Sequence, residues 1–349
     1  MEMEMEIEMN VTALGKSFKI EPRKLPYEKL VPYGLNPRLQ AQIDRRGGNP
    51  LTPDEIYDEI KPEEDTKLLR DKLFGSDTFA TEHWIYVKER PDGNFDVVEG
   101  SRRWVVMRMI REDDRSRFRN VCCWVIVDDM PDDYLLAWMS NHQEGKKSWP
   151  AYAQAAQCFN LCKSGHTHKE IAEHTRFSKT TVGEKIAIYT LNFAYYTETK
   201  DESFENKFSV LSRVYEALTL PPDSDKKHTK LSFLKTKQKV LFEAVKDEWI
   251  TGKESPRKFA AILRCPEAFE VIKNGISEPK FKRALRLALS KTPEMEGIIG
   301  DTIKYLKTLR KENTEVAKVL KDKKEKEPRK LFKDLRDEVQ SICNMAGIK

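Results

Sequence analysis

The sequence predicts an α+β protein, in which a small domain of strands and helices is followed by a chain that is helical almost throughout. Three observations support this fold class: a hairpin signal at Asp92-Gly93, a change of hydrophobic period after Gly100, and helical periodicity past Pro131. We therefore expect a mixed domain over residues 18–130, an all-α domain over residues 131–192 and a helical region of unassigned role over residues 193–349.

Composition and charge favour a soluble globular protein. Of the 349 residues, 39% are hydrophobic and 34% are charged, and no segment approaches the roughly 20 apolar residues that cross a bilayer. The first residues lack the features of a signal peptide, so we expect a cytoplasmic protein without a membrane partner. The net charge of +5 is too small to establish a nucleic-acid partner by itself.

The six cysteines form no paired framework, and we interpret them as reduced thiols. Cys158 and Cys162 lie one helical turn apart and close to His166 and His168, and these four residues suggest a zinc site. Because no Cys-x-x-Cys pair is present and small buried thiols are common on helices, we favour buried thiols over a metal site.

The segments before the hairpin are predicted from alternation, proline content and helical spacing. Residues 1–10 alternate apolar and acidic side chains, which is typical of an edge strand or a frayed terminus. Four prolines in residues 18–38 favour an extended, turning path, and residues 41–62 predict a loop around a short helix at best. A helix should follow over residues 62–74, with Leu69, Leu73 and Phe74 on one face.

The hairpin consists of the apolar run at residues 84–87, the turn at Asp92-Gly93 and a second strand over residues 95–98. After Gly100 the apolar residues Trp104, Met107 and Ile110 recur in steps of three, which predicts a buried helix from about Ser101. The continuous apolar run over residues 121–127 predicts a buried strand.

The turn at Gly100 is a candidate phosphate site. A glycine at a helix start lets the backbone approach a ligand closely, and the unpaired first-turn N–H groups favour an anion. Arg102 and Arg103 add guanidinium groups whose donors match phosphate oxygens. The alternative is an ordinary strand-to-helix turn that carries two solvated arginines.

Four segments together resemble ParB-type partition proteins. Residues 99–104 resemble the Gly-Glu-Arg-Arg box of that family, and Ile85-Tyr86-Val87 stands where the family has its Pro-Ile-x-Val strand. Asn36-Pro37-Arg38 is similar to the upstream Asn-Pro-x-x-Pro-Arg segment, and Ser140-Asn141-His142-Gln143 to the Glu-Asn-x-Gln box. The resemblance covers approximately residues 25–190, and the order of the motifs is more specific than any one of them.

The resemblance implies a ParB/sulfiredoxin-like domain that binds CTP, with Mg²⁺ as a candidate accompanying ion, and a homodimer that binds double-stranded DNA and a partition ATPase. Ser101 and Ser140 stand where the family has glutamate, so hydrolysis is expected to be weak or absent. The nucleotide-binding residues it suggests are Arg38, Gly100, Ser101, Arg102, Arg103 and Asn141. For Asn141, an ordinary backbone contact at a helix end is the alternative.

The spacing between His168 and Tyr189 is that of a helix-turn-helix. Ala172 is small where two helices would cross, Ser178 is able to cap the second helix, and Val182 and Ile186 would face its buried side. We expect this second helix over residues 178–189; the alternative is a helical hairpin without a DNA partner. The candidate DNA contacts are Ser178, Lys179, Thr180, Thr181, Glu184 and Lys185.

The carboxy-terminal third shows no family resemblance. Residues 221–225 predict a loop between helices, and residues 298–320 predict an amphipathic helix. A last helix over residues 331–345 has heptad-like spacing, for which we favour core packing over self-association.

Three functions follow from these patterns. The first is a CTP-regulated DNA-binding protein in plasmid or chromosome partition or in transcriptional control. The second is an enzyme on the same scaffold, a phosphotransferase or nuclease, with Glu82 and Glu99 as the nearest carboxylates. The third is a DNA-binding regulator that has lost nucleotide chemistry, which the two serines Ser101 and Ser140 favour over an efficient hydrolase.

Overall fold

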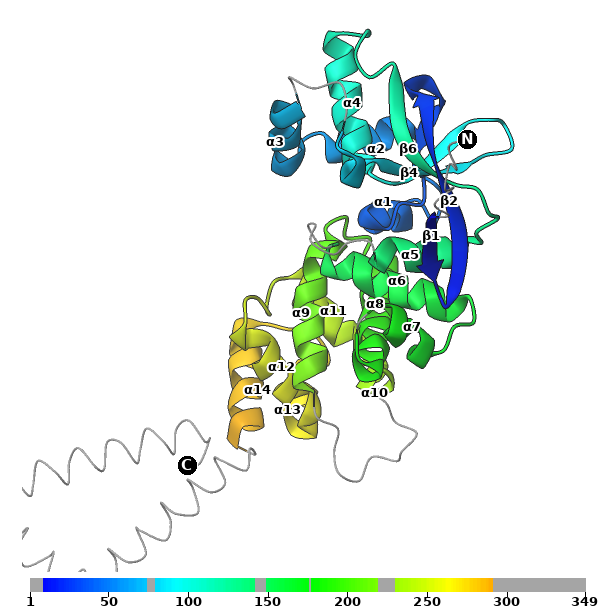
Figure 1. Cartoon of the computed structure of the whole chain (residues 1–349). Coiled ribbons are helices and arrows are strands. Elements are labelled where there is room, and N and C mark those ends of the chain that lie inside the picture. The colour runs from blue at the N-terminus through cyan, green and yellow to red at the C-terminus, as the bar shows by residue number, and fades with distance from the viewer. Residues whose placement is uncertain (1–8, 74–78, 142–148, 176, 219–229, 291–349) are drawn as a thin grey trace, which may run out of the picture. The chain divides into compact units, whose positions relative to one another are not determined.

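A computed structural model describes residues 9–73, 79–141, 149–175, 177–218 and 230–290 (Figure 1). The chain divides into two compact units, Met1–Thr190 and Leu191–Lys349. The loop predicted at residues 221–225 and the helices predicted at residues 298–320 and 331–345 lie outside the described residues, as do Gln143 and Arg176.

A mixed sheet organises the first unit. In the described residues it has six strands in the order β1-β2-β6-β4-β5-β3. The β6/β4 and β5/β3 pairs are parallel, and the other neighbours are antiparallel. The strands are β1 (Met9–Ala13), β2 (Lys16–Pro26), β3 (Leu30–Pro32), β4 (Ile85–Glu89), β5 (Phe95–Glu99) and β6 (Asn120–Ile126).

Along the chain, the helices of the first unit connect the strands of the sheet or follow the last strand. Three short 3-10 turns lie at Tyr27–Lys29, Pro37–Leu39 and Thr81–His83. The α-helices are α1 (Gln40–Arg45), α2 (Pro53–Ile60), α3 (Glu64–Leu73), α4 (Ser101–Asp113), α5 (Asp132–Asn141), α6 (Ala151–Lys163), α7 (His168–Thr175) and α8 (Lys179–Thr199), the last of which crosses the boundary between the units.

Alternation along the strands gives the sheet two apolar faces. Ile85, Val87 and Val125 lie in one cluster with the buried side of α4 and with α1 and α2. Tyr86 and Trp124 belong to the other cluster, which α5 covers. The sheet is therefore a central layer. Because β3 and β5 run parallel, the chain leaves both strands at the same end of the sheet, toward the turn at Pro37–Leu39 and toward α4.

The predicted hairpin, helix and buried strand are confirmed. β4 and β5 pair antiparallel around Gly93, which has φ +77°. α4 begins at Ser101 as expected, and β6 spans the apolar run that was predicted as a buried strand. Most of the alternating start of the chain lies outside the described residues, and the edge strand β1 begins at Met9.

The prediction for residues 41–62 is wrong. Two helices, α1 and α2, occupy most of this segment, and Ile56, Tyr57 and Ile60 of α2 are buried in the core. The start of α2 is a capping box: Glu55 N–H donates to Thr52 Oγ1, and Thr52 N–H donates to the Glu55 carboxylate over 2.7 Å. This local signal outweighs the glycines and prolines that predicted a loop.

Helices α5 to α8 share a small core of their own, formed by Ala137, Cys158, Leu161, Ile171 and Val182, with Ala172, Phe177 and Ile186 packed against it. The apolar faces predicted for the helix-turn-helix are confirmed by these contacts. The predicted end of the second helix is wrong, because α8 continues to Thr199; Leu191 and Tyr195 keep its apolar side buried.

The second unit is helical in its described part. Tyr195 of α8 packs edge-on against Phe242, and Phe259 stacks on Phe281. The helices are α9 (Phe204–Ala217), α10 (Lys230–Thr236), α11 (Gln238–Lys246), α12 (Glu254–Arg264), α13 (Pro266–Ile272) and α14 (Glu278–Ser290).

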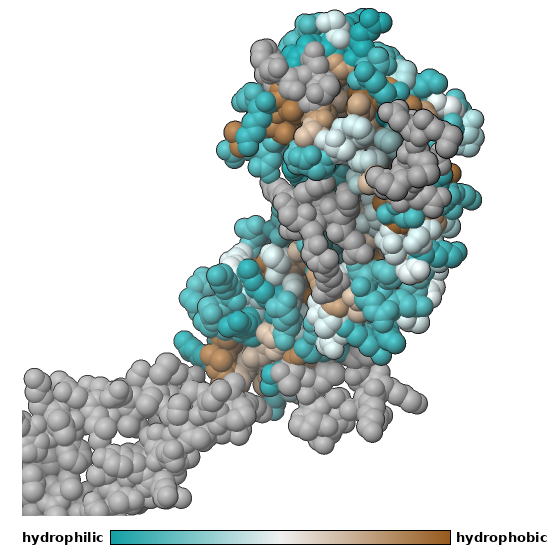
Figure 2. Space-filling view, viewed as in Figure 1, coloured by the Kyte–Doolittle hydropathy of each residue, from teal (hydrophilic) through white to brown (hydrophobic). Residues whose placement is uncertain are grey.

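Hydrophilic residues cover most of the visible described surface (Figure 2). Large exposed apolar side chains occur singly in the described residues, as at Leu68 and Phe193. Among the described helices, none combines the length and the apolar character that a bilayer crossing requires.

Candidate functional site

Gly100 forms the junction between β5 and α4, and no other residue fits there without strain. Its φ is +104°, and a Cβ at this position would lie 2.5 Å from Ile85 Cγ2 and 3.1 Å from Arg103 Nε. The glycine therefore both supplies the left-handed turn and lets the guanidinium of Arg103 pass close to the backbone. The first-turn N–H groups of α4 point out of this junction, because no preceding helical turn accepts them.

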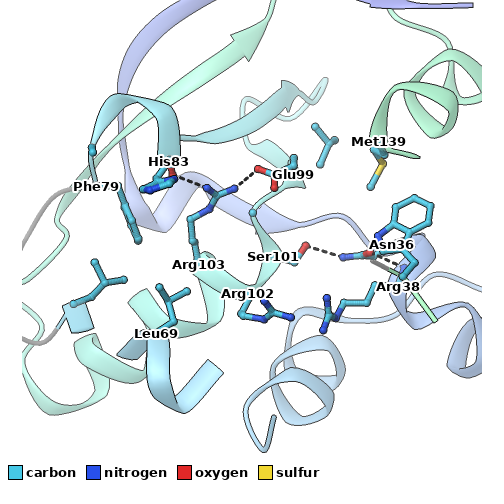
Figure 3. A pocket seen from close by; sticks show the side chains of 15 residues that line it. Asn36, Arg38, Leu69, Phe79, His83, Glu99, Ser101, Arg102, Arg103 and Met139 are labelled. Carbon is cyan, nitrogen blue, oxygen red and sulfur yellow. Dashed lines mark hydrogen bonds and ion pairs between the residues drawn. The ribbon is translucent and has the colours of Figure 1, made fainter. Parts of the chain in front are cut away.

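A cavity of about 390 Å³ lies at this junction, and it collects most of the predicted nucleotide-binding residues (Figure 3). Arg38, Gly100, Ser101, Arg102 and Arg103 all line it. They come from the 3-10 turn after β3 and from the start of α4, so the fold brings together segments that are more than sixty residues apart. The volume is within the range of small-molecule sites.

Arg38 and Arg102 meet at one carboxylate, which belongs to Glu63. Arg38 binds Glu63 through two donors, Nη2 at 2.7 Å and Nε at 3.2 Å, and Arg102 Nη2 lies 3.3 Å from the same side chain. Asp65 lies 4.0 Å from Arg102 Nη2. Arg102 Nε is buried and has no hydrogen-bond partner in the described part of the chain. Glu63 thus partly neutralises the charge of Arg38 and Arg102, but one donor of Arg102 still has no hydrogen-bond partner in the described residues.

Arg103 has a structural role. It is almost fully buried, donates through Nη1 to the His83 carbonyl over 2.8 Å and forms an ion pair with Glu99, which is also buried (Figure 3). The predicted pair of phosphate-binding arginines is therefore divided by the fold: Arg102 is directed toward Arg38, and Arg103 ties α4 to the strand that precedes it.

Ser101 is held by Asn36 at the centre of the cavity wall. The Asn36 amide donates to Ser101 Oγ over 2.7 Å, and both side chains are buried (Figure 3). The Asn36 carbonyl oxygen accepts the N–H of Arg38 over 3.0 Å and caps the short turn that carries that arginine. One asparagine therefore positions two predicted ligand-binding residues.

The rest of the cavity wall is apolar and aromatic. Leu69 of α3 and Phe79 lie on the side of Arg103, whereas Met139 of α5 lies beyond Ser101 (Figure 3). Leu73 of α3 also lines the cavity. Trp149 is buried and completes this wall. The cavity thus combines a cationic edge with an apolar wall that includes two aromatic side chains, Phe79 and Trp149.

Ser140 and Asn141, at the end of α5, are placed differently from the residues that line the cavity. Ser140 does not line the cavity; its Oγ donates to the Ala137 carbonyl over 2.7 Å and accepts the Gln157 amide of α6. Asn141 is the last residue of α5, and its side chain lies outside the described residues. Ser140 is thus part of the packing between α5 and α6.

Glu63, Asn36 and the apolar wall were not predicted as site residues. Asn36 precedes Pro37 at a capping position, which was a usable signal. Glu63 gave no signal, because a lone glutamate before a helix is common and its contacts depend on the tertiary fold.

The start of α8 presents most of the predicted DNA contacts. Ser178 caps the helix by accepting the N–H of Thr181 over 3.0 Å, and Ser178, Lys179 and Thr180 are exposed. Lys185 is placed elsewhere: its Nζ donates to Gln154 of α6 over 3.2 Å and lies 4.4 Å above the Phe177 ring. Burial lowers the pKa of Lys185.

A buried carboxylate connects α1 to α6 and α8. Asp44 Oδ2 accepts the hydroxyls of Tyr152 over 2.5 Å and of Tyr189 over 3.0 Å, and Oδ1 accepts the Gln40 amide over 2.9 Å. Desolvation raises the pKa of Asp44, although all three hydrogen bonds act in the other direction. α1 follows directly after Arg38, so this network links the segment that carries a cavity arginine to α8.

No protein-family model and no curated protein sequence matches the chain. Among solved structures, it is similar to the C-terminally truncated chromosome-partitioning protein ParB from Caulobacter crescentus, crystallised with the centromeric parS site. The two share 17% sequence identity at a TM-score of 0.35, over 68% of this chain and 98% of that chain. The comparisons therefore do not assign the chain to a family.

Proposed function

We propose that this chain is a ParB-type DNA-binding protein whose cavity at the start of α4 binds a nucleoside triphosphate, with CTP as the first candidate. The observation that carries the proposal is the convergence of Arg38, Arg102 and the Gly100 turn on one cavity. Guanidinium groups and unpaired helix N–H groups are the donors that bind phosphate, and the apolar wall suits a planar base.

The site fits a triphosphate by the chemistry of its donors. Arg38 and Arg102 would hold phosphate oxygens, the first-turn N–H groups of α4 would donate to a second phosphate group, and the Ser101 hydroxyl would add another donor. Mg²⁺ usually binds in such sites through the phosphates themselves and one or two carboxylates. CTP with Mg²⁺ is therefore the first ligand to test.

We further propose binding without efficient hydrolysis. Glu99 is the one carboxylate among the described residues that line the cavity, and it is paired with Arg103. Ser101 is held by Asn36, and Ser140 is held by Gln157. A phosphotransferase would need a metal-holding carboxylate and a positioned base near the phosphates. These contacts favour a regulator over the enzyme alternative.

DNA binding is proposed for the exposed start of α8. Lys179 and the cap residues are available to phosphates or base edges, and α7 supports α8 through the shared core of Ile171 and Val182. The homodimer, the partition ATPase and the role in partition rest on the sequence resemblance alone.

Isothermal titration with each of the four ribonucleoside triphosphates tests the nucleotide half. We expect CTP to bind with Mg²⁺, and Arg102→Ala to weaken binding at least tenfold. Arg119→Ala is the matched control, because this exposed arginine lies outside the cavity and carries the same charge. No binding of any triphosphate to the wild-type chain would overturn the nucleotide half. An equal loss in both variants would assign the effect to net charge.

A second measurement tests the regulatory link. Binding of a mixed-sequence DNA duplex to the full chain is followed by fluorescence anisotropy, with and without the triphosphate that titration identifies. We expect the affinity to change when the nucleotide is present, and this change to be lost in Arg102→Ala. If the affinity for the duplex is the same with and without the triphosphate, nucleotide binding does not regulate DNA binding.

A further inference from the structure

The described part of the second unit contains a stretch with an excess of positive charge. Residues 253–290 contain nine lysines and arginines against four glutamates and no aspartate, a balance of +5 that equals the net charge of all 349 residues. The remainder of the chain is therefore neutral overall. By contrast, residues 151–190, which include the proposed helix-turn-helix, have a balance of only +2, from five lysines and arginines against three glutamates.

Within this stretch, α14 places its cations on one side. Lys282 and Arg286 are four residues apart and Arg283 and Arg286 are three apart, so these side chains are neighbours on the helix surface. All three are exposed, whereas Ala284 and Ala288 on the opposite side are buried. Lys280 is also exposed and lies three residues before Arg283, at the edge of this face. We refer to Lys280, Lys282, Arg283 and Arg286 as the α14 basic face.

Little of this charge is neutralised by carboxylates. Lys282 pairs with Glu278 over 2.5 Å, and Lys280 donates to the Gly275 carbonyl over 3.3 Å. Arg283 and Arg286 have no ion-pair partner in the described residues. The adjacent helix α12 adds the exposed cations Arg257, Lys258 and Arg264, and a single pair at 3.9 Å joins Arg257 to Glu254.

The helix is held rigidly enough to present these side chains as a surface. Phe281 stacks on Phe259 of α12 with ring centroids 6.3 Å apart, and on Trp249 at 6.0 Å. α12 and α14 lie side by side in the second unit (Figure 1). A helix of 13 residues is about 20 Å long, so the face is long enough to meet several phosphates of a duplex.

We propose that the α14 basic face is a second, sequence-independent binding surface for the phosphate backbone of double-stranded nucleic acid. The charge complementarity is direct, because duplex DNA carries closely spaced phosphates and arginine binds them through paired donors. The face would supply the electrostatic affinity that residues 151–190 lack, while the start of α8 would supply selectivity.

The salt dependence of duplex binding tests this proposal. The affinity of a mixed-sequence duplex is measured by anisotropy from about 50 to about 200 mM KCl. We expect K280Q/R283Q/R286Q to reduce the slope of log affinity against log salt by as much as about 2.7, because each lost phosphate contact removes about 0.9. K67Q/K72Q/R119Q is the matched control, since it removes three exposed charges from the first unit.

The outcomes separate this proposal from the proposed function. A smaller slope in the α14 variant, with the control unchanged and the triphosphate titration intact, supports the proposal. Equal slopes in the two variants would overturn it, whether or not a nucleotide binds. Binding of poly-glutamate is measured in the same way as a model of an acidic protein partner. If the α14 variant loses poly-glutamate binding but keeps the duplex slope of the wild type, the face belongs to an acidic protein partner and the proposal is overturned. Helical circular dichroism of each variant shows that the unit remains folded.

Discussion

Glu63 and Arg102 form an ion pair, with 3.3 Å between Oε2 and Nη2, at the edge of the cavity that carries the proposed phosphate site. The same carboxylate binds Arg38 over 2.7 Å. An anion that approaches either arginine must therefore compete with a carboxylate that already belongs to the protein. The buried and unpartnered Nε of Arg102 shows that Glu63 does not satisfy this arginine completely.

Glu63→Gln should strengthen nucleotide binding. At an effective dielectric constant of about 20, two unit charges 4 Å apart interact by about 4 kcal/mol, so removal of the competing charge favours a phosphate. Both arginines are partly exposed, which reduces the effect, and we expect about a tenfold gain in affinity, or about 1.4 kcal/mol. Isothermal titration with the triphosphate measures it.

Glu64→Gln is the matched control for this prediction. Glu64 is the next residue along the chain, is exposed and does not line the cavity. It should leave the affinity within about twofold of the wild type, as is usual for one surface charge. A lower affinity in Glu63→Gln would show that Glu63 positions the arginines for the ligand and does not compete with it.

Gly100→Ala should destabilise the first unit more than Gly93→Ala does. Both glycines have positive φ, +104° and +77°, so an alanine at either position costs about 1 kcal/mol or more in backbone strain. Only at Gly100 would the new Cβ also lie 2.5 Å from Ile85 Cγ2; nothing lies within 4 Å at Gly93. Thermal melts of the two variants isolate the clash, and equal losses would contradict it.

Local signals were sufficient to predict β4, β5, β6 and α4 from the sequence. The turn at Asp92-Gly93, the change of period after Gly100 and the apolar run before Val127 each depend on neighbouring residues. The two helices in residues 41–62 were missed because glycine and proline content was given more weight than the capping box at Thr52 and Glu55. Boundaries set by tertiary burial, such as the end of α8, were predicted least well.

The candidate site was predictable only in part for a similar reason. A glycine followed by two arginines indicates a phosphate turn, but it does not show which guanidinium faces the cavity. That choice depends on Glu99 and the His83 carbonyl, which hold Arg103, and on Glu63, which holds Arg102. Such partners come from distant segments, and no spacing rule connects them.

Lys179 and Lys185 should respond differently to removal of their charge. Lys179→Met removes an exposed cation at the start of α8 and should reduce the salt slope of duplex binding by about 1. Lys185→Met, two turns later, replaces a cation that contacts Gln154 and Phe177, and should leave the slope unchanged. Equal losses would place both lysines at the DNA.

The pH dependence of stability provides a second check on Lys185. Burial lowers its pKa, so between the folded pKa and the usual value of about 10.5 the unfolded chain binds more protons than the folded one. Stability from this group therefore rises with pH across that window. Lys185→Met should abolish this contribution. The urea midpoint of the variant relative to that of the wild type should therefore decrease from neutral to alkaline pH.

Tyr189→Phe should loosen the connection between α1 and α8. It removes one of the two hydroxyl donors to Asp44, and a typical hydrogen bond contributes about 0.5 to 1.5 kcal/mol. We expect the urea midpoint to fall accordingly. Tyr196→Phe is the control, because this half-exposed tyrosine of the same helix has no contact with Asp44.

The pH dependence of the same network distinguishes Asp44 from the other carboxylates. Burial raises the pKa of Asp44, so the folded chain binds more protons than the unfolded one from about pH 4 up to the raised pKa, and stability from this group falls as pH rises through that window. Asp44→Asn keeps an oxygen for the tyrosine hydroxyls but cannot ionise. The urea midpoint of the wild type relative to Asp44→Asn should therefore decrease with increasing pH. A difference that increases instead would mean that ionised Asp44 is the form that holds α6 and α8 to α1.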